Sequence, residues 1–392
     1  MGDSTPQILG WRWVECGGFL ETPELPVPFY GKIDWQAQVE GYEPSRKFAG
    51  FKRLHPVLKT LVKLLDEISQ EIPQLLDSPR PRTGIYAAGL LEAERDWLLH
   101  LLERGGKIRP SHGPLLTHNG INFTVASFLG IPFYSGWGIN HVCSSGNDLL
   151  RLALWEIGRG SVDVAILVAI NSMFSTVRTA YHQVLGIVSP RGSILSFAEE
   201  RNGTVVADGM VVMVLASTSW TERHGLPSHG RVLSSASVAD SSHMYGLDPD
   251  GEAWSTALLE ALRMANLTPE EIDVVKAHGT GTKMNDSVEG GILSRIFSRS
   301  SPTVTALKPR LGHTISASSL LELAVLLEET EEAEKVPPIG GVSSSMVDPV
   351  FKGLKLATCD QQWPCNRPAK VVSMAAGFGG FYSAAVIEVE GA

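Results

Sequence analysis

Apolar residues recur along the chain in two spacings, one typical of buried strands and one typical of helices that cover a sheet. Residues 162–170 are almost continuously apolar and rich in valine and isoleucine, as expected for a strand buried on both faces. Residues 57–72 and 147–158 carry apolar residues at helical spacing instead. Alternation of these two kinds of element predicts an α/β protein with helices layered on sheets.

Both halves of the chain show this alternation. Expected strands cover residues 83–88, 133–140, 162–170, 203–217, 231–239, 272–277, 303–307, 371–374 and 383–389, and residues 203–217 are either one strand or a pair. Expected helices cover residues 57–72, 92–104, 115–129, 147–158, 252–265, 287–297 and 316–328. Residues 1–50 indicate a strand followed by irregular segments, and residues 221–230 indicate a polar connection. A weak two-fold repeat predicts an N-terminal half over 1–225 and a C-terminal half over 226–392.

The composition narrows the class of protein. A chain of 392 residues with 43% hydrophobic and 19% charged residues is typical of a globular protein with a large core. Its net charge of −9 is opposite to that of a general nucleic-acid binder. We find no signal-peptide pattern and no apolar stretch of roughly 20 residues, and so expect a cytoplasmic protein that does not enter membranes. Cys16, Cys143, Cys359 and Cys365 have neither disulfide-scaffold nor zinc spacing, so no metal is expected.

Cys143 is the strongest candidate nucleophile. It follows an extended segment and begins an expected helix, whose free N–H groups and partial positive charge favour the thiolate over the thiol. Ser144, Ser145 and Gly146 are small enough for a tight turn and for close approach of a substrate. The alternative is a buried structural cysteine, which is the commoner role of a lone cysteine.

Two segments of the C-terminal half place histidines after expected strands. His278 precedes alternating glycine and threonine, so it either projects into a cleft at the end of its strand or closes a turn. Lys308 is followed by His313 and then by Glu322 on the next expected helix. These three residues either form a buried polar relay, in which the carboxylate stabilises the lysine, or are a surface lysine and a helix-capping histidine.

The segment Gly377-Phe378-Gly379-Gly380 lies between the last two expected strands. Three glycines around one aromatic residue allow backbone N–H groups to approach a ligand, which makes this segment a candidate oxyanion donor. The alternative is a tight turn with a packed phenylalanine.

Taken together and in order, these segments resemble the elongating β-ketoacyl-[acyl-carrier-protein] synthases, the ketosynthases of fatty-acid and polyketide assembly. The matching stretches are Cys143-Ser-Ser-Gly, Ala277-His-Gly-Thr-Gly-Thr with Asn285-Asp286, Lys308 with Leu311-Gly-His-Thr, and Gly377-Phe-Gly-Gly. The resemblance implies a thiolase-like fold, a five-layered α/β/α/β/α arrangement of two duplicated halves. It also implies that no cofactor is needed.

The resemblance further implies a two-step reaction. Cys143 would take an acyl group from an acyl carrier protein, and the carbanion of a malonyl-type extender on a carrier protein would then attack the Cys143 thioester with loss of CO2. His278 and His313 would hold the extender's thioester oxygen, and Lys308, paired with Glu322, would orient this group. The backbone N–H groups of Cys143 and Phe378, flanked by Gly377 and Gly379, would form an oxyanion hole, and Phe378 would gate access. The implied partners are carrier proteins and, in a homodimer or heterodimer, a second ketosynthase-like chain.

Several departures from the family pattern surround the expected pocket. The usual N-terminal strand is not recognisable in residues 7–17, and Phe381-Tyr382 replace the usual Thr-Asn. Ile315-Ser-Ala-Ser-Ser replace small residues after Gly-His-Thr, and Pro309-Arg310 follow Lys308 where a serine is common. These changes favour a specialised polyketide or polyene pathway over housekeeping fatty-acid synthesis.

Two alternatives to condensation stay open. The Cys143-bound acyl group could pass to an amine or an alcohol, or the chain could be a non-catalytic partner subunit that resembles a chain-length factor. The intact Cys143 argues against the second. The lack of a cysteine beside Gly377 disfavours a thiolase, and His313, which stands where initiating synthases have asparagine, favours elongation.

Overall fold

The structure is a computed structural model that describes residues 5–22, 27–117, 119–173, 175–241, 246–364 and 367–390. Within these residues, one mixed sheet has the strand order β12-β10-β9-β14-β15-β8-β1-β7-β6-β4-β5. Its strands are β1 (Pro6–Glu15), β4 (Thr83–Leu91), β5 (Phe133–Ile139), β6 (Val164–Ser172), β7 (Gly209–Ser217), β8 (Gly230–Ala239), β9 (Val274–Lys276), β10 (Thr303–Thr305), β12 (Lys355–Leu356), β14 (Ala369–Gly377) and β15 (Phe381–Val389). Two further small sheets pair β2 (Leu20–Glu21) with β3 (Phe29–Tyr30), and β11 (Lys335–Val336) with β13 (Gln361–Gln362).

Helices connect and cover these strands. They are α1 (Pro56–Glu71), α2 (Glu92–Glu103), α3 (Gly113–Leu116), α4 (Gly120–Leu129), α5 (Ser145–Gly158), α6 (Thr176–Val184), α7 (Thr218–His224), α8 (Glu252–Met264), α9 (Lys283–Ile296), α10 (Lys308–Leu311) and α11 (Ser318–Ala333). None of the helices in the described part of the chain is long and apolar enough to cross a bilayer.

The sheet contains the same strand pattern twice. In β5-β4-β6-β7-β1 the first three strands are parallel and the next two are each antiparallel to their neighbour. The order β10-β9-β14-β15-β8 has the same senses. The two halves join where β1 and β8 pair through Gln7 with Arg231 and Ile8 with Gly230. This repeat favours a division near residue 225, which stays a prediction.

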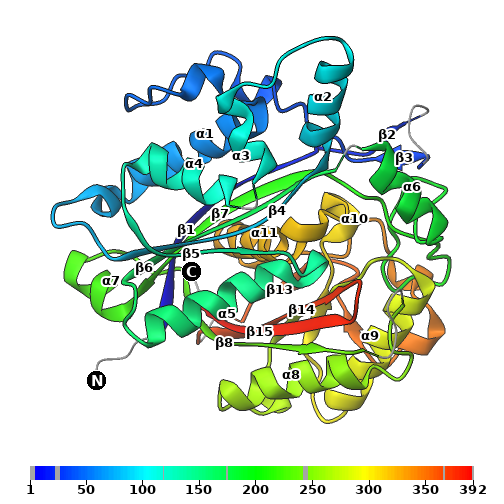
Figure 1. Cartoon of the computed structure of the whole chain (residues 1–392). Helices are drawn as coiled ribbons and strands as arrows, with labels where there is room; N and C mark the ends of the chain where they lie inside the picture. The colour runs from blue at the N-terminus through cyan, green and yellow to red at the C-terminus, as the bar shows by residue number, and fades with distance from the viewer. Residues whose placement is uncertain are drawn as a thin grey trace.

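Helices and sheet halves stack in five layers (Figure 1). Helices α1 and α4 pack on the outer face of the first half through one apolar cluster, and α8 and α9 pack on the outer face of the second half through another. Helices α5 and α11 lie between the two halves and share a central cluster with both. The predicted thiolase-like layering is therefore confirmed.

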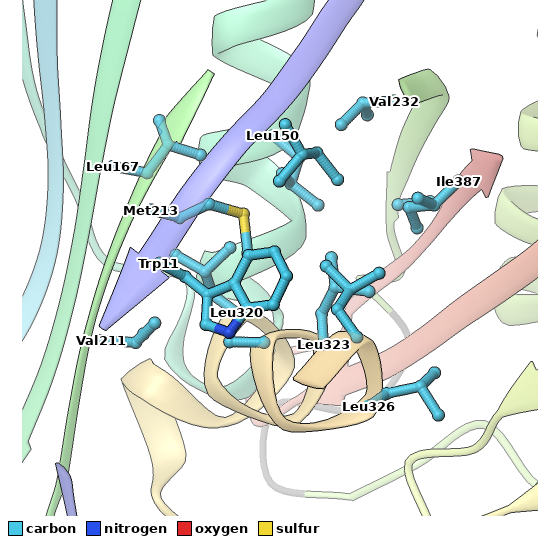
Figure 2. Close-up of a cluster of buried hydrophobic side chains, with 14 of the residues drawn as sticks. Trp11, Leu150, Leu167, Val211, Met213, Val232, Leu320, Leu323, Leu326 and Ile387 are labelled. Atoms are coloured by element: carbon cyan, nitrogen blue, oxygen red, sulfur yellow. The ribbon is translucent and has the colours of Figure 1, made fainter. Parts of the chain in front are cut away.

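Figure 2 shows this central cluster, where Leu150 of α5 and Leu320 of α11 meet Trp11, Met213 and Ile387 of the strands. Successive residues of a strand point to opposite faces, so neighbours in β6 enter different clusters. Leu167 faces the central cluster, whereas Ile166 and Val168 face the outer one. The apolar run predicted as a strand at residues 162–170 is thus largely β6, which begins at Val164 and is buried on both faces as predicted.

Some predicted elements differ from the structure. Residues 7–17, in which the family strand was not recognisable, contain most of β1, which pairs along β7 from Pro6 to Glu15. Its polar residues hide the pattern because they have partners on the covering helices: Arg12 pairs with Glu71 of α1. The helix predicted at 115–129 is broken into α3 and α4, with extended backbone at Thr117 between them.

Three helices were not predicted, α6, α7 and the short α10, and several predicted strands are shorter than expected. Helix α7 begins between β7 and β8, because Ser217 caps it by accepting a hydrogen bond from the Trp220 N–H. Helix α6 lies in a segment for which no helix was predicted. The strand expected from residue 203 begins only at Gly209. Residues 204–208 make isolated bridges instead, including Val206 with His313.

One buried carboxyl beside β6 gives a stability prediction. Glu94 of α2 is 2% exposed and accepts from Ser172 Oγ at 2.7 Å, and burial raises its pKa to about 8. Between pH 4.5 and 8 the folded state keeps this proton while the unfolded state releases it, so wild-type stability falls as pH rises, by up to about 1.4 kcal/mol per pH unit.

Glu94→Gln mimics the protonated side chain and lacks this titration. Denaturant unfolding across this window is expected to show the variant gaining stability relative to wild type as pH rises. The exposed Glu103→Gln on the same helix is the control, and a difference that does not change with pH would contradict the prediction.

Candidate active site

Cys143 lies in a strained turn at the start of α5. A short 3-10 helix over Val142–Ser144 leads into α5, and Val142 has a φ of +51°, which is unfavourable for a β-branched residue. Ser145 Oγ secures the turn by accepting from the His141 N–H at 2.9 Å and donating to the Val142 carbonyl at 2.7 Å. Cys143 is thereby presented at the N-terminal end of a helix, as the sequence predicted.

His313 is brought against Cys143 from the other half of the chain. Its Nε2 lies 3.2 Å from Cys143 Sγ. Its backbone is held on both sides, because its N–H donates to the Val205 carbonyl at 2.7 Å and its carbonyl accepts from the Ala207 N–H at 3.0 Å. The segment that replaced the first part of the expected strand therefore serves to position His313.

Lys308 and Glu322 form a buried relay, as one of the two alternatives predicted, but the histidine that Lys308 contacts is His278 and not the predicted His313. Lys308 Nζ lies 3.1 Å from His278 Nδ1 and 2.8 Å from Glu322 Oε1, and it donates to the His278 carbonyl at 2.6 Å. The rings of His278 and His313 lie 5.3 Å apart at a steep angle. The alternative of a surface lysine is wrong, because Lys308 is fully buried.

Two further residues of this relay were not predicted. Lys276, also fully buried, donates from Nζ to Glu322 Oε2 at 2.8 Å. Ser318 donates to Glu322 Oε1, and its Oγ lies 3.4 Å from His313 Nδ1. One carboxylate thus faces two lysines. The sequence signal for Lys276 was a lone charge in an apolar strand, and the signal for Ser318 was the serine in place of a small family residue.

A second carboxylate shapes the loop that carries His278. Glu289 of α9 accepts from the N–H groups of His278 at 2.6 Å and Gly279 at 2.8 Å. Gly279 has a φ of +48° and Gly281 a φ of +74°, so the two glycines permit the turn that Glu289 holds. His278 therefore leaves β9 in a fixed direction.

The glycine-rich segment closes the β14–β15 hairpin beside Cys143. A methyl group on Gly377 would lie 2.6 Å from the His141 carbonyl, so only glycine permits this approach. The residues that depart from the family pattern support the turn: the Phe381 ring stacks on His141 at 4.4 Å, and Tyr382 stacks on Trp254, which in turn contacts the His278 ring. Phe378, at the tip, is half-buried.

Burial dominates the protonation states of the site. It raises the pKa of the Cys143 thiol to about 12, although the positive charge of Lys308 opposes this shift. The expected thiolate is therefore not the resting form, because desolvation outweighs the helix N-terminus. Burial also lowers the pKa of His278 and of His313 well below 6.5, and Lys308 adds to both shifts. The resting site pairs a neutral thiol with two neutral imidazoles.

Cys143, His278 and His313 line a cavity of about 570 Å³, together with Thr280, Asn202 and Phe378. Their ligand atoms lie within 4.8 Å of one another, a spacing that could also hold a metal ion. Lys308 lies 3.1 Å from His278 Nδ1 and shares the single carboxylate of Glu322 with Lys276, and this excess of positive charge opposes binding of a further cation. The arrangement instead suits a nucleophile with hydrogen-bond donors for an oxyanion.

The approach of Cys143 to His313 depends on Gly146, where α5 crosses α11. A methyl group at Gly146 would lie 2.5 Å from the Leu320 nitrogen and from Ser319 Oγ. We expect Gly146→Ala to push the helices apart, lower stability by about 1–3 kcal/mol and slow any reaction of Cys143. Gly158→Ala, at the open end of the same helix, meets no atom within 4 Å and is the matched control. Thermal unfolding and thiol-alkylation rates test both variants, and equal effects of the two would contradict the prediction.

Comparisons with known proteins agree with this geometry. The family model described as "Beta-ketoacyl synthase, N-terminal domain" matches residues 137–220, and "Beta-ketoacyl synthase, C-terminal domain" matches residues 229–340. Together they span half of the chain. Cys143 falls in the first match, and His278, Lys308, His313 and Glu322 fall in the second.

Curated relatives include a putative polyketide beta-ketoacyl synthase 1 of Streptomyces virginiae, 24% identical over 92% of this chain and 88% of its own. The tetracenomycin polyketide synthase ketoacyl synthase alpha subunit of Streptomyces glaucescens is 30% identical over 62% of this chain. That match spans 58% of the relative's length.

Solved structures share the fold. The ishigamide ketosynthase/chain length factor aligns over all of both chains with a TM-score of 0.83 at 19% identity. A complex of a type II PKS acyl-carrier protein with its ketosynthase bound to the hexaketide aligns over 99% of this chain with a TM-score of 0.80 at 20% identity. With the two domain matches and the Cys-His-His site in one cavity, these findings show that the chain belongs to the β-ketoacyl synthase family.

Proposed function

We propose that the chain catalyses a decarboxylative Claisen condensation between an acyl group on Cys143 and a malonyl-type unit on an acyl carrier protein. The observation that carries this proposal is the contact of 3.2 Å between Cys143 Sγ and His313 Nε2, in a cavity that His278 also lines. A nucleophile and two imidazoles backed by a buried lysine supply both steps of such a reaction.

In the first step, Cys143 Sγ attacks the carbonyl carbon of the carrier-bound thioester. His313 Nε2 accepts the thiol proton and returns it to the carrier's sulfur as the carbon–sulfur bond breaks. Ser318 supports this role, because its hydroxyl donates to Glu322 and is left to accept from His313 Nδ1. The N–H groups of Cys143 and Phe378 would hold the oxyanion, with Gly377 and Gly379 allowing the turn, and Phe378 would gate the approach of the second substrate.

In the second step, the malonyl carboxylate leaves as CO2 and its bonding electrons form an enolate. His278 stabilises the enolate oxygen, because Lys308 occupies its Nδ1 and leaves Nε2–H as a donor. His313 joins it when its Nε2 carries a proton. The enolate carbon bonds to the acyl carbon, Cys143 leaves as a thiolate, and one proton from solvent restores the thiol.

Partners follow from this chemistry. Both substrates would arrive on acyl carrier proteins, with their thioester groups in the cavity that Cys143 lines. We also propose that a second ketosynthase-like chain, in a homodimer or a heterodimer, packs along β5. That strand is an edge of the sheet and exposes Tyr134 and Trp137. Native mass spectrometry of the pure chain separates self-association from a requirement for another subunit.

The test of the proposed function is intact-protein mass spectrometry with a panel of acyl carrier proteins, with and without malonyl carrier protein. We expect acyl mass on the wild type, released as a β-keto product two carbons longer only when malonyl carrier protein is present. Discharge to an added amine or alcohol without malonyl would instead establish the heteroatom transferase. Failure of a folded chain to acylate, alone or with a partner subunit, would refute both.

A further inference from the structure

A second cavity of about 510 Å³ lies beyond Phe378, which lines it as well as the cavity that contains Cys143. Val142 and Ile315 form part of its wall, and both pack against Cys143 in one apolar cluster. The other wall is α6, a helix that the sequence did not predict. An acyl chain on Cys143 therefore has this space within reach once Phe378 moves.

One side chain in this wall has no role in the chemistry proposed above. His182 of α6 is 3% exposed, and its Nδ1 is buried without a hydrogen-bond partner among the described residues. Buried polar atoms almost always have a partner, because they lose hydration when the chain folds. Because the His182 side chain lines the cavity, a polar atom on a bound chain would lie close enough to pair with its ring.

The chemistry of His182 indicates which polar atom fits. Burial, with a smaller effect from the charge of Arg178, lowers the pKa of His182 to about 4, so its ring is neutral near pH 7. A neutral imidazole donates one hydrogen bond and accepts one, which suits a carbonyl or a hydroxyl. Asn140 and Arg178 line the same cavity and add polar groups to its wall. An all-methylene chain would leave the His182 nitrogen unpaired.

We propose that His182 makes this cavity selective for acyl chains that carry a carbonyl or hydroxyl oxygen along their length, over plain alkyl chains. The proposal rests on the proposed function, since it requires an acyl group on Cys143. It adds a specificity-determining residue outside the Cys143, His278 and His313 set.

The experiment measures competition for Cys143 by intact-protein mass spectrometry. The probes are the N-acetylcysteamine thioesters of octanoic acid and of oxo-octanoic acids with the carbonyl at successive odd carbons. Wild type is expected to prefer at least one oxo chain over octanoyl, and His182→Leu to reduce that preference roughly tenfold, the effect of one lost neutral hydrogen bond. His182→Asn, which keeps a donor and an acceptor, is expected to restore part of it. Gln183→Leu removes an exposed polar group from the same helix and is the matched control.

The outcomes separate this inference from the proposed function. If wild type takes octanoyl as readily as every oxo chain, or if a folded His182→Leu keeps the full preference, the inference is overturned while the proposed function stands. If no thioester or carrier protein acylates Cys143, the proposed function fails and the inference fails with it. If His182→Leu does not fold, His182→Asn takes its place, and an unchanged wild-type preference in that variant overturns the inference.

Discussion

Cys143→Ala is expected to abolish acyl-enzyme formation and to lower the condensation rate by at least about 10⁴-fold, as removal of a covalent nucleophile does. Among the described residues that line the cavity, Cys143 is the one that carries a thiol. The substitution removes one sulfur from a site whose other groups stay in place, so we expect little change in the unfolding transition. Intact mass after incubation with acyl carrier protein measures the first effect, and product formation measures the second.

The control for this variant is Cys359→Ala. Cys359 is free and exposed, whereas Cys143 is buried against His313, and Cys365 lies outside the described residues. The control should acylate at the wild-type rate. Acylation of Cys143→Ala at an undiminished rate would show that another group carries the acyl chain and would sink the proposed mechanism.

Glu322→Gln is expected to destabilise the fold by about 3–5 kcal/mol, because it removes the carboxylate that faces two buried lysines. Although burial alone would raise the pKa of Glu322, Lys276 and Lys308 hold it below its usual value. The carboxylate is therefore charged throughout the neutral range, and glutamine cannot replace that charge. Equilibrium unfolding in denaturant measures the loss.

A second substitution tests whether charge is the cause. In the Glu322→Gln background, Lys276→Met removes one of the two unbalanced charges, so the double variant should be more stable than Glu322→Gln alone. Glu332→Gln, exposed on the same helix, should have almost no effect. Further loss in the double variant would mean that packing, and not charge balance, sets the cost.

Much of the fold could be predicted because its buried elements are periodic. Strand β6 is apolar on both faces, and α5 and α8 have a clear helical stripe, so their patterns need no knowledge of their neighbours. Elements whose partners lie far along the chain were harder. Strand β1 contains Arg12 and Glu15, and its identity as a strand depends on β7, about two hundred residues away.

The residues of the candidate site also differ in how far the sequence alone reveals them. Cys143, His278, Lys308 and His313 stand in short segments of distinctive composition, which the sequence displays directly. Lys276 could not be predicted as a partner of Glu322, because only the pairing of β9 in the sheet brings it over α11. The raised pKa of Cys143 was also missed, since local sequence shows the helix N-terminus but not the depth of burial that overrides it.

The contact between Cys143 and His313 joins residues 170 positions apart, on either side of the predicted division near residue 225. Contacts of such large separation form slowly, because the chain must lose much of its freedom before they stabilise it. We therefore expect the strands and helices on each side to form before the thiol is buried against His313. During refolding, competence for acylation should therefore return later than secondary structure, so that activity reports the docking of the two halves.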